Sequence, residues 1–201
     1  MTESAVSRHS ASMTVAASDT GPEPGRSAEV PPFEELYERH FDFIWRSLRR
    51  LGVRRAALDD AVQEVFLVVH RRLPEFEGRA ALKTWLFGIA LHVAQRFART
   101  SSRHQADELP EQLPHDPVAL TPHDEVARHE AIVMLYAILD GMDADKRAVF
   151  VMAELEQMTA PEIAGLLGVP LNTVYSRLRA ARHEFEASLT RLRARERWRQ
   201  P

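Results

Sequence analysis

The chain contains no cysteine among its 201 residues, which excludes disulfide frameworks, thiolate zinc sites and cysteine nucleophiles. It also lacks an apolar run of the roughly 18 residues that a membrane span needs, and the N-terminus lacks a signal-peptide pattern. A glycine-rich phosphate loop and an HExxH motif are both missing. We therefore expect a soluble cytoplasmic protein without membrane insertion that is not an enzyme and carries no metal or cofactor.

The small net charge of -3 conceals a strong segregation of charge along the chain. Residues 79–103 hold five basic residues and no acid, and residues 159–201 hold eight arginines against four glutamates. Residues 104–130 carry seven acids against one arginine. Two basic segments thus flank an acidic connector, and basic patches of this kind are what neutralisation of nucleic-acid phosphate requires.

The segment from Thr159 to Arg182 is typical of two short helices joined by a tight turn. Thr159 and Glu162 have the spacing of a capping box at the start of the first helix. Gly168 breaks that helix, and Pro170 restarts the chain with a fixed φ. The segment is therefore predicted to be a helix-turn-helix, the unit with which many proteins read DNA.

The second helix of this unit is predicted to have two unlike faces. Its apolar face carries Val174, Leu178, Ala181 and Phe185. Its outward face carries hydrogen-bond donors at Asn172, Ser176, Arg179 and His183, flanked by Thr173, Tyr175 and Arg182. Such side chains can read base edges in the major groove, although a solvated face on an ordinary helical hairpin remains the alternative interpretation.

The apolar spacing elsewhere predicts only helices, three between Phe33 and about residue 100 and two more before the helix-turn-helix. The predicted fold class is all-α, with two small helical domains joined by a flexible acidic linker, the second containing the helix-turn-helix. The predicted ranges are a disordered N-terminal tail at 1–31, a first domain at 32–100, a linker at 101–123, a second domain at 124–190 and a basic C-terminal tail at 191–201.

Three blocks of sequence, Asp59–Gly78, Leu82–Ala90 and the helix-turn-helix, occur in the order and at the spacing of a known family. Over roughly residues 33–190 the chain resembles bacterial RNA polymerase sigma factors of the extracytoplasmic-function (ECF) group. The resemblance implies an alternative sigma factor that binds core polymerase, through the β′ coiled coil and the β flap, and directs initiation at promoter DNA. It assigns residues 32–100 to region 2 and 124–190 to region 4, and leaves open an anti-sigma factor as a further partner.

The resemblance also implies roles for individual residues. Asp60, Gln63 and Glu64 share one polar helix face and would dock on the β′ coiled coil, although a solvated face is the alternative interpretation. Region 2 would melt the -10 element and hold a flipped-out base, with contacts from Phe76, Arg79, Lys83, Trp85, His92, Arg96 and Arg99. On spacing alone, Trp85 would more often be a core residue. Region 4 would read the -35 element through Asn172, Thr173, Tyr175, Ser176, Arg177, Arg179 and Arg182.

The chain departs from the family pattern at several of these positions. Leu91 and His92 stand where an Arg-Asn pair is expected, and Arg96 stands where an Asp is expected. In the recognition helix region, Pro170, Asn172 and Tyr175 replace the commoner Ser, Gly and Lys. The sequence therefore leaves the preferred bases at both promoter elements open.

Two other functional hypotheses fit part of the sequence. A helix-turn-helix regulator would act on duplex DNA without being a polymerase subunit, and a helical adaptor would bind only protein. The basic, acid-free helix around Trp85 favours the sigma factor, because a regulator's sensing domain has no need to hold single-stranded DNA. The acidic linker is either a nucleic-acid mimic in the RNA exit path or a plain spacer.

Overall fold

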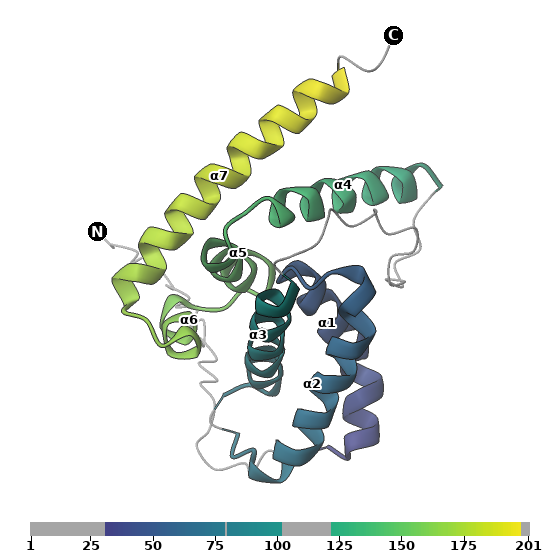
Figure 1. The fold of residues 1–201 in the computed structure, drawn as a ribbon, viewed down its shortest axis with the longest axis vertical. Helices are drawn as coiled ribbons and strands as arrows, with labels where there is room; N and C mark the ends of the chain where they lie inside the picture. Colours follow the sequence, from purple (N-terminus) through teal and green to yellow (C-terminus); the bar gives the residue numbers. More distant parts are fainter. Residues whose placement is uncertain (1–30, 79, 102–121, 198–201) are drawn as a thin grey trace, which may run out of the picture.

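The computed structural model describes residues 31–78, 80–101 and 122–197, and every regular element in these ranges is helical (Figure 1). The predicted all-α class is confirmed. The expected tail and linker fall almost wholly outside the described residues. The helices are α1 (Phe33–Arg50), α2 (Leu58–Arg72), α3 (Leu82–Ser101), α4 (Pro122–Asp140), α5 (Ala144–Phe150), α6 (Ala160–Leu167) and α7 (Leu171–Arg197).

Helices α1, α2 and α3 contact one another pairwise and form the N-terminal module, residues 31–101. The helical spacing read from the sequence is borne out in α1, where Leu36, Ile44 and Leu48 are fully buried. The chain leaves α1 at Gly52, whose φ of 91° lies in the left-handed region that favours glycine. A short 3₁₀ turn (Leu73–Glu75), which contains Pro74, follows α2.

The C-terminal module, residues 122–197, is built around the helix-turn-helix of α6 and α7. Thr159 and Glu162 form the predicted capping box, and Gly168 ends α6 with a φ of 64°. Val174 and Ala181 of α7 are fully buried, and the Phe185 ring stacks on Phe150 of α5 at 4.8 Å between centroids. A π-helical turn (Val151–Leu155) extends α5 toward α6. Helix α7 contacts α4 and continues well beyond this unit, and its C-terminal half rises away from the other helices (Figure 1).

The two modules are packed against each other. Their buried apolar side chains form one continuous cluster that includes Leu86 and Phe87 from α3 and Val149 and Ile163 from the C-terminal module. A Cβ added to Gly88 of α3 would lie 3.0 Å from Leu166 of α6, so the two helices approach closely at this glycine. The sequence pattern did not indicate this contact between the modules.

Candidate nucleic-acid and polymerase interfaces

The polar face of α2 has the arrangement predicted for a docking surface. Asp60 and Gln63 are exposed and Glu64 is partly exposed, whereas Val62 and Val65 on the other side of the helix are buried. The Glu64 carboxylate forms an ion pair with Arg96 of α3. The polymerase-facing and DNA-facing candidates of this module are therefore in direct contact with each other.

Beside this face lies an aromatic groove between α1 and α2 that sequence reasoning missed. Its volume is about 640 Å³, and the side chains of Tyr37 and Leu67 on it are 40% and 55% exposed. The signal in the sequence was the four-residue spacing of aromatic residues along α1. The groove is lined by Phe33, Tyr37, Phe41, Asp59, Val62, Gln63, Phe66, Leu67 and His70.

The predicted -10 contacts fall into two groups. The rings of Phe76 and Trp85 lie 5.1 Å apart between centroids, and Trp85 is partly buried against the core, so packing and base stacking are both compatible with its position. His92 and Arg96 are exposed further along α3. Arg79 and the side chain of Arg99 lie outside the described residues.

Lys83, at the start of α3, forms an ion pair with the C-terminal module and lies over an aromatic ring of α1. Its ammonium group lies 3.1 Å from a carboxylate oxygen of Glu156 and 4.7 Å from the centre of the Phe43 ring. Lys83 is 55% exposed, whereas the Glu156 side chain is 2% exposed. One of the predicted -10 contacts thus has an acidic partner within the same molecule.

The predicted -35 contacts lie on the outer face of α7, which Val174, Leu178 and Ala181 anchor to the core. Two arginines have acidic partners inside the module, because Arg177 pairs with Asp145 and Arg182 lies 2.7 Å from Glu154. Thr173 and Arg177 are partly exposed, and the remaining predicted contacts are exposed: Asn172, Tyr175, Ser176, Arg179 and Arg182.

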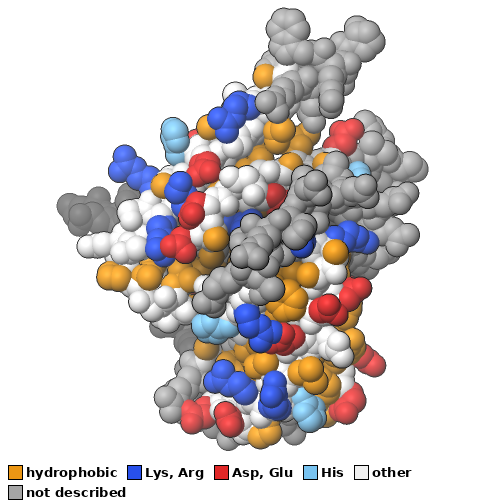
Figure 2. All heavy atoms as spheres, viewed as in Figure 1, with side chains coloured by type: hydrophobic (Ala, Val, Ile, Leu, Met, Phe, Trp, Pro, Cys, Tyr) orange, Lys and Arg blue, Asp and Glu red, His pale blue; other side chains and the backbone are white. Residues whose placement is uncertain are grey.

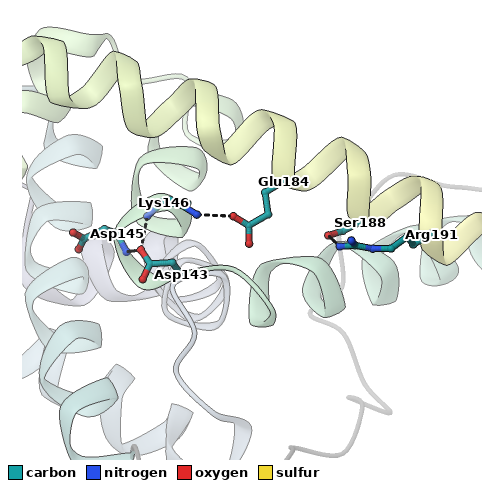
Figure 3. A network of polar contacts seen from close by, with 6 residues as sticks. All are labelled: Asp143, Asp145, Lys146, Glu184, Ser188 and Arg191. Carbon is teal, nitrogen blue, oxygen red and sulfur yellow. Dashed lines mark hydrogen bonds and ion pairs between the residues drawn. The ribbon is translucent and has the colours of Figure 1, made fainter.

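Arg179 opens onto a groove of about 720 Å³ between α5 and α7, whose lining includes Lys146, His183 and Arg191. Lys146 donates a hydrogen bond of 2.9 Å to Glu184, which raises the Lys146 pKa (Figure 3). On the face shown in Figure 2, basic and acidic side chains are interspersed rather than gathered in one uniform basic patch. The ion pairs orient Arg177 and Arg182, and Arg179 lies exposed on this groove.

The described part of the chain contains neither a cluster of metal ligands nor a membrane-spanning helix. It contains no cluster of three His, Asp or Glu side chains that could hold a metal ion. Within the same ranges, no helix is long and apolar enough to cross a membrane.

Two family descriptions match the chain. Sigma-70 region 2 matches residues 36–104 and Sigma-70 region 4 matches residues 132–184. Among curated relatives, ECF RNA polymerase sigma factor SigX of Bacillus subtilis is 30% identical over 146 residues, covering 67% of this chain and 72% of the relative. ECF RNA polymerase sigma factor SigE of Mycolicibacterium smegmatis is 29% identical, and the match covers 83% of this chain but only 65% of that protein.

Solved structures agree with these matches. CnrH in complex with the cytosolic domain of CnrY is similar with a TM-score of 0.57 and 25% identity, over 79% of this chain and 87% of that chain. A second structure, RpoE with the anti-sigma factor NepR from Bartonella quintana, has a TM-score of 0.56 at 18% identity and supports the fold alone.

Proposed function

The chain belongs to the extracytoplasmic-function group of RNA polymerase sigma factors, and from this premise we propose how its two modules divide the work of promoter recognition. The N-terminal module binds core polymerase and opens the -10 element. The C-terminal module reads the -35 element as duplex. Both act in the cytoplasm, as a polymerase subunit without catalytic activity of its own.

The observation that carries this division is the difference between the two DNA-facing surfaces. An α7 face of exposed donors on a buried apolar stripe suits the major groove of an intact duplex. The Phe76 and Trp85 rings, 5.1 Å apart near the start of α3, instead suit an unstacked base of a single strand. A regulator that reads only duplex DNA has no use for the second surface.

Polymerase binding is assigned to Asp60, Gln63 and Glu64 on α2. The side chains of Asp60 and Gln63 are exposed on one face, next to the aromatic groove that gives this surface an apolar centre. An apolar centre with a polar rim is the usual composition of a protein interface. The β′ coiled coil is the partner that the family implies for this face, and the β flap is the partner implied for region 4. An anti-sigma factor is a further candidate partner.

Run-off transcription with purified core polymerase tests the function. Specific starts are expected only when core polymerase and this chain are both present. Footprints made by the chain alone, without any requirement for core, would favour a conventional helix-turn-helix regulator. A triple variant, Asp60→Ala with Gln63→Ala and Glu64→Ala, is expected to lose co-purification with β′ while retaining its helical circular dichroism spectrum.

A further inference from the structure

Glu156 holds a cation on each of its two carboxylate oxygens, and both cations come from the N-terminal module. Arg50 Nη1 lies 2.9 Å from Oε1, and Lys83 Nζ lies 3.1 Å from Oε2. The Glu156 side chain is 2% exposed, so this contact is shielded from water and salt. One anion bridging an arginine and a lysine is also how a DNA phosphate would be held there.

A second bridge crosses the same boundary between the modules. Arg49 of α1 donates two hydrogen bonds, of 2.8 and 2.7 Å, to the two carboxylate oxygens of Asp140 at the end of α4. The Arg49 guanidinium also lies 4.7 Å from the centre of the Tyr136 ring. Arg49 is 5% exposed. Bidentate geometry of this kind fixes orientation as well as distance.

The backbone makes room for the contact at Gly52 and, as described above, at Gly88. The guanidinium of Arg147, from α5, occupies the space that a side chain at Gly52 would need. Arg147 donates a hydrogen bond of 3.2 Å to the carbonyl oxygen of Leu139, and burial lowers its pKa. The fit is therefore specific in shape as well as in charge.

This closed arrangement is incompatible with reading two promoter elements at once. The names of the elements place them about 25 base pairs apart, which is on the order of 85 Å of duplex at 3.4 Å per base pair. In the closed molecule α3 and α6 are in van der Waals contact. The modules must separate before both elements can be bound.

We propose that Glu156 is an internal competitor for DNA phosphate, which keeps the free protein closed until polymerase separates the modules. This inference rests on the proposed function, because it takes Lys83 to be a DNA contact. In the closed state, Glu156 neutralises Arg50 and Lys83, and the Arg49–Asp140 bridge holds the C-terminal module in place. Opening replaces one carboxylate by the phosphates of the melted strand.

The distance between the modules tests the closed state without any DNA. Because the full chain has no cysteine, Glu38→Cys on α1 and Glu186→Cys on α7, both exposed positions, give two unique sites for fluorescent labels. A single short distance is expected for the otherwise unchanged chain. Glu156→Gln is expected to shift molecules to longer distances. Asp140→Asn weakens the second bridge and should have the same effect. The Asp140 side chain is 44% exposed, so this variant is expected to fold.

Glu154→Gln is the matched control. Glu154 lies two residues before Glu156, and it pairs with Arg182 inside the C-terminal module. The substitution therefore removes the same charge without removing a contact between the modules. Its distance should equal that of the unchanged chain. An extended distance in the unchanged chain would refute the closed state. Short distances in both Glu156→Gln and Asp140→Asn would refute the role of the two bridges in holding the modules together.

Binding of a labelled single strand of mixed sequence, about 12 nucleotides long, tests the competition itself. If about 90% of the molecules are closed, opening raises the apparent affinity about tenfold. Glu156→Gln should approach this gain and Glu154→Gln should show none. Longer distances with unchanged affinity would overturn the role of Glu156 as a competitor. Absence of specific run-off transcription by the unchanged chain with core polymerase would overturn the proposed function, and the distance measurement does not depend on that result.

Discussion

The predicted -10 contacts Lys83 and Trp85 (the α3 face) and the predicted -35 contacts on α7 (the α7 face) are similar, since each set combines basic residues with an aromatic ring. The two faces contact different neighbours. On α3, Lys83 is held by Glu156 of the other module. On α7, Arg177 and Arg182 are held by acids of their own module, while Arg179 lies exposed on an open groove. A contact within a module survives any movement of the modules, whereas a contact between modules is lost when they separate. The two faces therefore differ in whether the free protein can use them.

The largest effect is expected from removing the aromatic surface of the α3 face. Trp85→Ala should lower formation of the open complex by about 1–3 kcal/mol, the contribution of stacking on one base. Permanganate reactivity of -10 thymines in holoenzyme measures this. Trp45→Ala, at another partly buried tryptophan, controls for lost packing. Equal melting defects in both variants would show that Trp85 acts only through the core.

The α7 face should respond to Arg179→Ala with a loss of about 1–3 kcal/mol in promoter binding if the side chain touches a base. Arg177→Ala should cost less, because Asp145 already engages that guanidinium. Both can be read by titrating promoter DNA with holoenzyme at two salt concentrations. Arg39→Ala, an exposed arginine on α1, serves as control. An unaltered promoter profile for Arg179→Ala would mean that the reading face is wrongly assigned.

The contact between the modules should weaken in Gly52→Ala. A left-handed φ costs a non-glycine residue about 1–2 kcal/mol, and the new methyl group displaces Arg147. Urea denaturation should show this loss of stability. Gly165→Ala is the matched control, because no atom lies within 4 Å of its added Cβ, and it should stabilise α6 by about 0.5–1 kcal/mol. Similar stabilities for the two variants would contradict the close fit at Gly52.

The smallest effect concerns the support of the α7 face by the capping box. The Thr159 hydroxyl donates to Glu162 and lowers the Glu162 pKa, and the Thr159 backbone N–H does so as well. The stabilisation is therefore present above the unfolded pKa and is lost as pH falls through the lowered pKa. Glu162→Ala should cost about 0.5–1 kcal/mol at neutral pH. In thermal melts, its difference from the unchanged chain should vanish in acid, and a constant difference would count against the box.

Local rules were enough to predict the helix-turn-helix. The capping spacing of Thr159 and Glu162, the break at Gly168 and the apolar stripe at Val174 depend only on neighbours along the chain, and each has the predicted structure. The exposed donors of α7 followed from the same helical spacing. What spacing could not indicate was that Arg177 and Arg182 have acidic partners, because Asp145 and Glu154 come from another helix.

The order of the residues alone determined that the described elements are helical and that two segments of the chain are basic. The use of those segments was decided by the tertiary structure, which brings Glu156 to Arg50 and Lys83 across a large sequence separation. The physical reason is range: helix propensity and capping act within a few residues, whereas charge pairing and close packing depend on which surfaces meet in space.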